Sequence, residues 1–293
     1  MSSALGWPVE QIGEALAALL TGLRVEVLPQ VDSTNSELMR RARNGQMEPV
    51  LLVAEQQTAG RGRLGRHWFS GEGTSVGASF AAGPPQGGTA PSGGSAVREA
   101  TSVGAIPSLT FSLGLPLSPR DWSGLSLAVG VCVVQSLHPD LRLKWPNDVW
   151  WHERKLAGIL IETASFGELR YAVIGIGINI KRRESSGLAT PAAWLQELLP
   201  AVDASQALLR IAIPLVQTVK AFERHGFAPF QAGFTERDAL SGLNVALSDG
   251  TVGVAQGVDG AGALRLHTAQ GLQKITSAEV SVRPLLSPSL DGF

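Results

Sequence analysis

The chain has 293 residues, 44% of them hydrophobic and 17% charged, with a formal net charge of −1 and a single cysteine, Cys132. This length and composition suit a globular protein with one large domain or a large and a small one. The near-zero charge argues against a global basic field that attracts nucleic acid or membranes. One cysteine excludes an intramolecular disulfide, and no apolar run approaches the ~20 residues of a membrane span. We therefore expect a cytoplasmic protein in which Cys132 is an inert buried thiol.

The N-terminal segments alternate between helical and extended patterns. Residues 8–23 predict an amphipathic helix, and residues 24–30 alternate like a strand. The segment 32–45 predicts a second helix, which begins at a capping residue and ends at a glycine. Residues 50–56, VLLVAEQ, form a short apolar run typical of a buried strand.

Residues 57–70, QTAGRGRLGRHWFS, interleave three arginines with three glycines. Arginine offers fork-shaped donors suited to phosphate or carboxylate, and glycine lets the backbone approach a ligand closely. The spacing is not that of a Walker loop, and no helix pattern follows. Arg/Gly runs also occur in disordered RNA-binding segments, but this stretch is short, unrepeated and joined to a buried strand. We interpret it as a loop that uses Arg61, Arg63 and Arg66 to bind an anion.

The rest of the chain divides into an inserted segment, a region of helix and strand patterns, and a C-terminal region of short β-runs. Residues 83–107 are rich in Gly, Pro, Ser and Ala and lack periodicity, which indicates an inserted, mobile loop. Strands are expected at 108–117, 141–151, 155–163 and 169–180, and helices at 121–139 and 204–224. From about residue 240, short β-runs alternate with glycine turns, as in a small all-β barrel. The sequence therefore predicts an α+β protein with a larger domain at 1–238 and a barrel at 239–293.

The segment KWPNDVW, which begins at Lys144, is unusual inside a β-region. Pro146 removes a ladder donor, so the strand has to break there and present Asn147 and Asp148 at a bend. Taken alone, a plain hairpin turn is the simpler explanation, since Asn-Asp is good turn chemistry. Lys155 begins the next strand, where it either reaches for solvent or neutralises an anion.

Two further motifs are candidates for ligand contact. VIGIGINI at 173–180 places glycines in alternation, so one face of the strand lacks side chains and accepts either a close-packed helix or a flat ligand. Asn179 at its end is a candidate polar contact. DSTN at 32–35 clusters hydroxyl and amide groups at a helix N-terminus, for capping alone or as donors to a neutral polar ligand. The five histidines show no metal-ligand spacing.

In this order and spacing, the motifs resemble those of the biotin–protein ligases. DSTN, AGRGRLGRHW, KWPNDV, KLAGILIE and GIGINI, followed by a small β-domain, extend the resemblance over residues 27–283. The GRGRxGRxW and KWPND elements are its most specific parts. The resemblance implies a class II synthetase-like biotin–lipoate ligase domain with a mixed sheet, plus a C-terminal SH3-like β-barrel.

The resemblance also implies roles for particular residues, and no dedicated protein metal site. On the biotin side they are Ser33, Thr34, Asn35, Gln57, Arg61, Gly62, Arg63, Lys155 and Gly158. On the ATP or adenylate side they are Arg61, Arg63, Arg66, Trp68, Lys155, Asn179, Trp194 and Arg283. The residues expected to carry the chemistry are Lys155, Arg61, Arg63 and Asp148.

Members of that family form biotinyl-5′-AMP from biotin and ATP with Mg²⁺, then transfer biotin to a lysine of a biotin carboxyl carrier protein. Fixed cations at the reacting phosphate would account for a chain without a recognisable catalytic triad. Only about 25 residues precede the first motif, so we expect a monofunctional ligase without sequence-specific DNA binding. A lipoate ligase or octanoyl transferase of the same fold is the nearest alternative. An Arg/Gly-type nucleic-acid binder is the alternative from another class.

Overall fold

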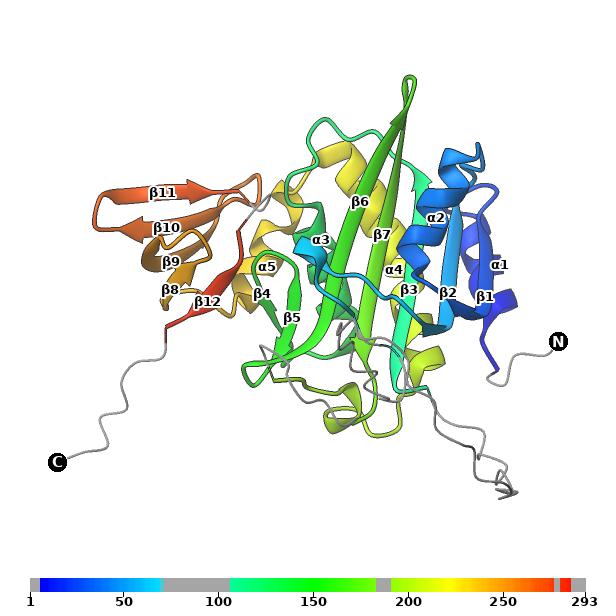
Figure 1. Ribbon diagram of the computed structural model, residues 1–293, viewed down its shortest axis with the longest axis horizontal. Coiled ribbons are helices and arrows are strands. Elements are labelled where there is room, and N and C mark those ends of the chain that lie inside the picture. Colours follow the sequence, from blue (N-terminus) through cyan, green and yellow to red (C-terminus); the bar gives the residue numbers. More distant parts are fainter. Residues whose placement is uncertain (1–5, 69, 71–105, 183–190, 277–279, 286–293) are drawn as a thin grey trace, which may run out of the picture.

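The computed structural model describes residues 6–68, 70, 106–182, 191–276 and 280–285, so the expected loop at 83–107 lies outside the described residues except for its last two. A seven-stranded sheet forms the centre of the molecule (Figure 1). Its strands are β1 (Arg24–Val31), β2 (Val50–Gln57), β3 (Ser108–Pro116), β4 (Arg142–Lys144), β5 (Asp148–Trp151), β6 (Arg154–Phe166) and β7 (Leu169–Asn179).

The strand order β1-β2-β3-β7-β6-β5-β4 makes this a mixed sheet. Strands β1 and β2 are parallel, and every other neighbouring pair is antiparallel. The extended strand is interrupted at Pro146, where a turn joins β4 to β5. Lys144 pairs with Asp148 across this hairpin. The predicted break is therefore confirmed, and it takes the form of the plain hairpin turn.

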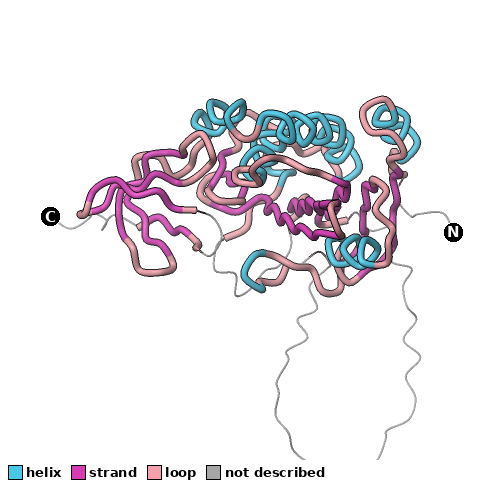
Figure 2. Tube along the Cα trace, turned by 90° about the horizontal axis from the view of Figure 1, so that it is seen from above, coloured by secondary structure: helices cyan, strands magenta, loops and turns pink. Residues whose placement is uncertain are grey.

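The helices cover the two faces of the sheet unequally (Figure 2). They are α1 (Val9–Ala17), α2 (Thr34–Arg43), α3 (Leu125–Leu137), α4 (Ala204–His225) and α5 (Gln231–Arg237). Four of them lie on one face, and α2 lies on the other. Helix α3 is apolar on nearly every side because it packs between the sheet and α4. Among the helices described, none has the length and apolar character needed to cross a membrane.

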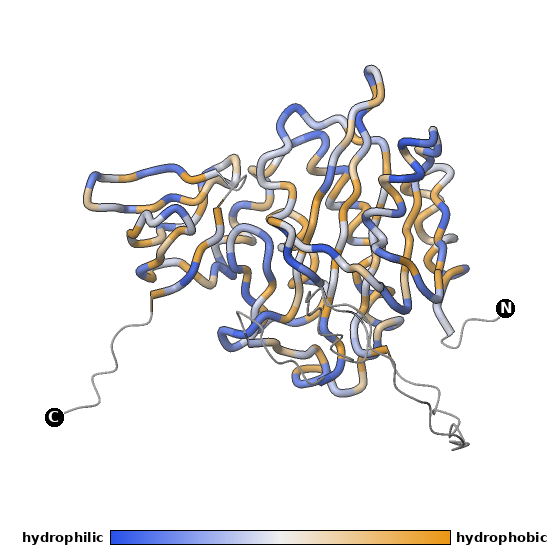
Figure 3. The backbone as a smooth tube through the Cα atoms, in the orientation of Figure 1, coloured by the Kyte–Doolittle hydropathy of each residue, from blue (hydrophilic) through white to orange (hydrophobic). Residues whose placement is uncertain are grey.

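The alternation of residues along β7 separates the core from the α2 face. Ile174, Ile176 and Ile178 are buried in the core beneath the helices. Because side chains in a strand alternate between faces, Gly175 and Gly177 point to the α2 face. Figure 3 shows hydrophobic stretches along the central strands and hydrophilic residues in several of the loops around them.

The N-terminal helix is shorter than the pattern at 8–23 predicts, because α1 ends at Ala17. Beyond it, the Leu19 and Leu23 amides bond to carbonyls three residues back, at Leu16 and Leu20. The leucines still pack against the core from these tighter turns, so the apolar pattern persists after the helix has ended.

A second, antiparallel sheet of five strands follows in the order β11-β10-β9-β8-β12. Its strands are β8 (Asn244–Leu247), β9 (Val252–Val258), β10 (Leu264–Thr268), β11 (Gly271–Ile275) and β12 (Val282–Pro284). The α+β class and the C-terminal β-unit are confirmed. The SH3-like closure and the division at residues 238 and 239 stay predictions.

Candidate active site

The register of the central sheet brings several of the predicted segments into one row. Asp148 on β5 lies opposite Gly158 on β6, which pairs with Gly177 on β7. Gly177 in turn pairs with Thr110 on β3, which pairs with Ala54 on β2. Two central members of this row have no side chain, so the row forms a floor with polar groups toward its ends.

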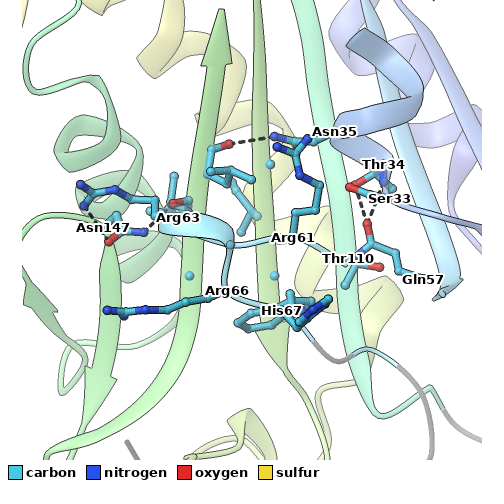
Figure 4. Close-up of a pocket in the computed structure, with 18 of the residues that line it drawn as sticks. Ser33, Thr34, Asn35, Gln57, Arg61, Arg63, Arg66, His67, Thr110 and Asn147 are labelled. Carbon is cyan, nitrogen blue, oxygen red and sulfur yellow. Dashed lines mark hydrogen bonds between the residues drawn. The ribbon is translucent and has the colours of Figure 1, made fainter. Parts of the chain in front are cut away.

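A cavity of about 200 Å³ lies over this floor, on the α2 face (Figure 4). Every residue expected on the biotin side lines it: Ser33, Thr34, Asn35, Gln57, Arg61, Gly62, Arg63, Lys155 and Gly158. From the other expected residues, Arg66, Trp68, Asp148 and Asn179 also line it. The motifs that the sequence analysis singled out, although far apart in the chain, therefore meet at one cavity.

One end of the cavity is polar and carries no net charge. Ser33 caps α2 by accepting a hydrogen bond from the Ser36 amide at 3.4 Å, which directs the next two side chains into the cavity. The Thr34 amide donates to Gln57 Oε1 at 2.7 Å, and the Asn35 Oδ1 atom lies 2.7 Å from the hydroxyl of Ser112. Thr34, Asn35 and Ser112 are buried, so their mutual hydrogen bonds hold this wall rigidly.

The other end gathers ionic groups. Lys155 Nζ lies 2.6 Å from Asp148 Oδ1, and Arg63 Nη1 donates to Asn147 Oδ1 at 3.4 Å. Burial lowers the pKa of the Arg63 guanidinium, an effect that the nearby Asp148 carboxylate opposes. A guanidinium remains charged at neutral pH even so. Two cations therefore stand beside one carboxylate, an arrangement that suits an anionic ligand.

The Lys155 backbone is fixed from both sides. Its amide donates to the Pro191 carbonyl at 2.8 Å, and its carbonyl accepts from the Ala193 amide at 2.9 Å. Asn179 Nδ2 donates to the same carbonyl at 3.2 Å. In this structure Asn179 therefore supports the strand segment that carries the lysine.

The Trp68 indole lies on the glycine floor. A Cβ atom added at Gly177 would overlap the indole, and one at Gly158 would lie 3.5 Å from it. The Lys155 ammonium is 5.9 Å from the centre of a Trp68 ring. The side-chain-free face of β7 thus receives two groups from the chain itself: the Trp68 indole and, at Gly175, the Asn35 amide of α2.

The arginines of the Arg/Gly loop point in different directions (Figure 4). Arg61 reaches toward the polar end and forms an ion pair with Glu162 at 3.1 Å. Arg63 reaches toward Asn147 at the ionic end. The loop bends at Leu64, whose φ of 56° lies in the left-handed region. The sequence groups these arginines together, whereas the structure distributes them over both ends of the cavity.

Two of the expected residues are not brought to this cavity. Trp194 precedes the short 3₁₀ turn at Leu195–Glu197 and does not line it. Arg283 on β12 lines a larger cavity of about 1120 Å³, between the β4–β5 hairpin and the C-terminal sheet.

Lys144 also lines this larger cavity, and its Nζ atom lies 5.0 Å from the centre of a Trp150 ring. Burial lowers the pKa of Lys144, and Asp148 opposes the effect.

Sequence reasoning assigned no ligand-side role to four residues that shape the site: Thr110, Ser112, Asn147 and Glu162. Thr110 and Ser112 are polar residues two apart within a strand that is mostly buried and apolar. That pattern was visible, since buried polar groups need partners. Asn147 was placed at the bend without a role. Glu162 lies at the end of a strand-like motif, and only its contacts with Asn35 and Arg61 in the folded chain reveal its role.

Comparison with known proteins identifies the family. Residues 27–179 match the model of the Biotin/lipoate A/B protein ligase family, and residues 243–283 match the Biotin protein ligase C terminal domain. A biotin–[acetyl-CoA-carboxylase] ligase of Paracoccus denitrificans is 33% identical over 263 residues, covering 87% of this chain and 98% of that protein. The bifunctional ligase/repressor BirA of Escherichia coli K12 is 31% identical over 275 residues, covering 90% and 75%.

A solved structure agrees with these sequence relatives. The biotin protein ligase of Aquifex aeolicus in complex with biotin and ATP superposes with a TM-score of 0.67 at 26% identity, covering 89% of this chain and 99% of that one. The chain thus belongs to the biotin protein ligases, a class of ligase enzymes. These relatives favour biotin over lipoate as the acyl group, as the motifs predicted.

Proposed function

We propose that this protein forms biotinyl-5′-AMP from biotin and ATP and then transfers biotin to a lysine of a biotin carboxyl carrier domain. The observation that carries the proposal is the single cavity with a neutral polar wall at one end and the Lys155, Asp148 and Arg63 group at the other. A ligand with a neutral polar head and a carboxylate tail fits such a cavity. The motif matches assign Ser33, Thr34, Asn35, Gln57 and Gly158 to the biotin side.

In the first step, a biotin carboxylate oxygen attacks the α-phosphorus of ATP, and the bond to pyrophosphate breaks. Two anions have to approach each other, and charge gathers on the phosphate oxygens. Lys155 and Arg63 supply positive charge at this end of the cavity, and Arg66 lies near Arg63. In the second step, a lysine amine attacks the acyl carbon and AMP leaves with the bonding electrons.

We assign Mg²⁺ to this site as a companion of ATP. Asp148 and Asn147 offer a carboxylate and an amide oxygen beside the cations, which fits an ion that takes few protein ligands and several phosphate oxygens. Within the described ranges, no group of three or more His, Cys, Asp or Glu lies together. When bound there, Mg²⁺ would neutralise phosphate charge.

We place Arg66, Trp68 and Asn179 on the nucleotide side, together with Lys144 and Arg283 of the neighbouring cavity. Lys144 supports this placement because it pairs with Asp148 across the β4–β5 hairpin, so the hairpin contributes Asp148 to one cavity and Lys144 to the other. Trp194 lines neither of these two cavities, and its place on the adenine side stays a prediction from the motif match. Because ATP is the expected co-substrate, we place the reaction in the cytoplasm.

The test is pyrophosphate release measured with each substrate alone and with both. We expect release only when biotin and ATP are present together, loss of release when EDTA removes Mg²⁺, and none when lipoate replaces biotin. A carrier domain should then become avidin-reactive, and the same domain with its acceptor lysine replaced by arginine should not. Release driven by lipoate, or by ATP without biotin, would contradict the proposal.

A further inference from the structure

Glu162 lies on β6 just beyond the cavity, on the same face as Gly158 and Leu160. Each oxygen of its carboxylate contacts a different part of the site. Oε2 accepts a hydrogen bond from Asn35 Nδ2 at 2.9 Å, and Oε1 lies 3.1 Å from Arg61 Nη1. One carboxylate therefore joins the rigid polar wall to the Arg/Gly loop.

We propose that Glu162 is a positioning residue, which sets the hydrogen-bonding pattern of the biotin-side wall and anchors the loop through Arg61. It does not line the cavity, so it acts through these two neighbours. The inference rests on the proposed assignment of Asn35 and Arg61 to the biotin side.

The effect on the wall follows from a property of carboxylates. An ionised carboxylate only accepts hydrogen bonds, so the Asn35 amide must turn its NH₂ group toward Glu162. The same NH₂ group also donates to the Leu160 carbonyl at 3.3 Å. Asn35 Oδ1 then faces Ser112, whose single hydroxyl proton is directed to it at 2.7 Å.

The direction of hydrogen-bond donation is passed on to the next residues of the wall. With its proton committed to Asn35, the Ser112 oxygen can only accept from the Thr34 hydroxyl, which lies 2.7 Å away. Thr34 Oγ1 also lies 3.1 Å from Gln57 Oε1, a second acceptor for the same proton. Glu162 thus determines which atoms of the wall remain donors and which remain acceptors for a ligand. With a neutral side chain at this position, only the longer 3.3 Å hydrogen bond to the Leu160 carbonyl would hold the Asn35 amide in this direction.

The effect on the loop follows from exposure. The Arg61 side chain is 52% exposed, whereas that of Glu162 is 23% exposed and is held by Asn35. Arg61 Nη1 also donates to Ser36 Oγ at 3.4 Å. The more exposed partner is therefore tied to a more buried one, so the ion pair restrains the loop against β6 and α2.

Glu162→Gln tests both effects, because glutamine offers one acceptor and one donor group and cannot accept from both partners. The matched control is Glu26→Gln on the edge strand β1. Glu26 pairs with Arg41 at 2.6 Å and its side chain is 27% exposed, but it does not line the cavity. Both variants remove a close ion pair between an arginine and a partly buried glutamate, and Glu26→Gln also removes a longer one, with Arg24 at 3.9 Å.

We expect biotin binding, measured by calorimetry without ATP, to weaken about tenfold in Glu162→Gln, as for loss of a charged hydrogen bond. The control should stay within twofold of wild type. At saturating biotin and ATP, the rate of pyrophosphate release should change less than the biotin affinity does, since the residue lies away from the reacting phosphate. A purely structural defect would lower both together.

Trypsin gives a second readout that needs no ligand. Cleavage after Arg61, compared with cleavage after Arg66 in the same digest, should rise at least about threefold in Glu162→Gln and stay constant in the control. A protein that never made biotinyl-5′-AMP would contradict the proposed function, yet this digest would still test the contact between Glu162 and Arg61.

Glu162→Asp guards against misfolding as the cause, because it keeps a group that only accepts hydrogen bonds. It should recover part of the biotin affinity that Glu162→Gln loses. Unchanged biotin affinity and unchanged cleavage after Arg61 in Glu162→Gln would overturn the inference. Equal loss of biotin affinity in both Glu162 variants would overturn its account of the wall.

Discussion

Lys155 is the residue on which the proposed chemistry depends most. Its ammonium is paired with Asp148 at 2.6 Å and lies near the Trp68 indole, while its backbone is fixed by bonds to residues 191 and 193. The lysine was recognisable in the sequence as one that either reaches for solvent or neutralises an anion. The ion pair inside a cavity favours the second reading.

We expect Lys155→Ala to reduce pyrophosphate release by at least about 100-fold, because two reacting anions would face each other with one cation fewer. Lys155→Arg should keep part of the rate, since it retains the charge but changes its shape. Lys274→Ala is the control, as it removes a lysine paired with Asp259 at 3.0 Å on the C-terminal sheet. Wild-type rates in Lys155→Ala would contradict the assignment.

Arg63→Gly should weaken retention of biotinyl-5′-AMP by roughly 10- to 100-fold, through loss of charge-assisted hydrogen bonds worth about 1.5–3 kcal/mol. Adenylate formation should survive better, because Lys155 remains. We expect the variant to label serum albumin in the presence of biotin and ATP, as seen on an avidin blot.

Leu64→Gly is the control for added loop flexibility, because glycine suits its φ of 56° and no cation is lost. If Arg63→Gly makes adenylate but labels albumin no more than wild type or this control, the Arg/Gly loop does not retain the intermediate.

At the scale of elements, the glycine-bearing face of β7 decides how the loop and α2 approach the sheet. Gly175 receives the Asn35 amide and Gly177 receives the Trp68 indole. The isoleucines on the opposite face hold the strand in the core, so β7 cannot move away from added bulk. A side chain added on the glycine face would therefore displace the Asn35 amide or the Trp68 indole rather than β7 itself.

Gly177→Ala should displace the Trp68 indole and weaken both biotin and ATP binding by about tenfold or more, a typical penalty for overpacking. The melting temperature should fall only slightly, because the indole belongs to a surface loop that can swing outward. Gly13→Ala in α1 is the control, since a Cβ there meets nothing within 4 Å. Unchanged ligand affinity in Gly177→Ala would show that the indole position is irrelevant to binding.

At the scale of the whole molecule, the two sheets share one core. Val245, Leu264 and Leu266 of the C-terminal sheet belong to the same buried cluster as the helices of the larger sheet. The Trp145 indole donates to the Gly262 carbonyl at 3.1 Å across this contact. The chain passes between the sheets at Asp238, which pairs with Leu143 at the edge of β4.

Asp238 makes the stability of this junction depend on pH. Burial raises the pKa of its carboxyl from 3.8 to about 6, although Oδ1 accepts a hydrogen bond from the Leu240 amide at 2.8 Å. No hydrogen-bond partner for Oδ2 is found in the described part of the chain. Between pH 4 and 6 the folded state binds more protons than the unfolded state, so the free energy of unfolding falls as pH rises.

Asp238→Asn should therefore raise the free energy of unfolding at pH 7.5 by about 1–3 kcal/mol and change it little at pH 4. Denaturant unfolding at both pH values measures this. Asp121→Asn is the control, because exposed Asp121 accepts from the amide two residues on with the same 2.8 Å geometry. Stabilisation of equal size at both pH values would contradict the titration of Asp238.

The sequence by itself located most of the elements and many of the residues that line the cavity. Apolar periodicity located the strands and helices, and composition located the C-terminal β-unit, because these signals are written in neighbouring residues. It erred at α1, where the apolar pattern outlasts the helix. Short motifs located nearly all residues that line the cavity, because glycine, arginine and proline at such spacings restrict local backbone and charge.

Only the tertiary structure decided how these pieces are combined. Strand order and register set Asp148, Gly158, Gly177 and Thr110 in one row, and such pairings join residues too distant for a local pattern to relate. The packing of α2 and the Arg/Gly loop against β6 placed Glu162 between Asn35 and Arg61. Folding also directed Arg61 and Arg63 to opposite ends of one cavity and placed Arg283 in another, because the direction of a side chain depends on what packs around it.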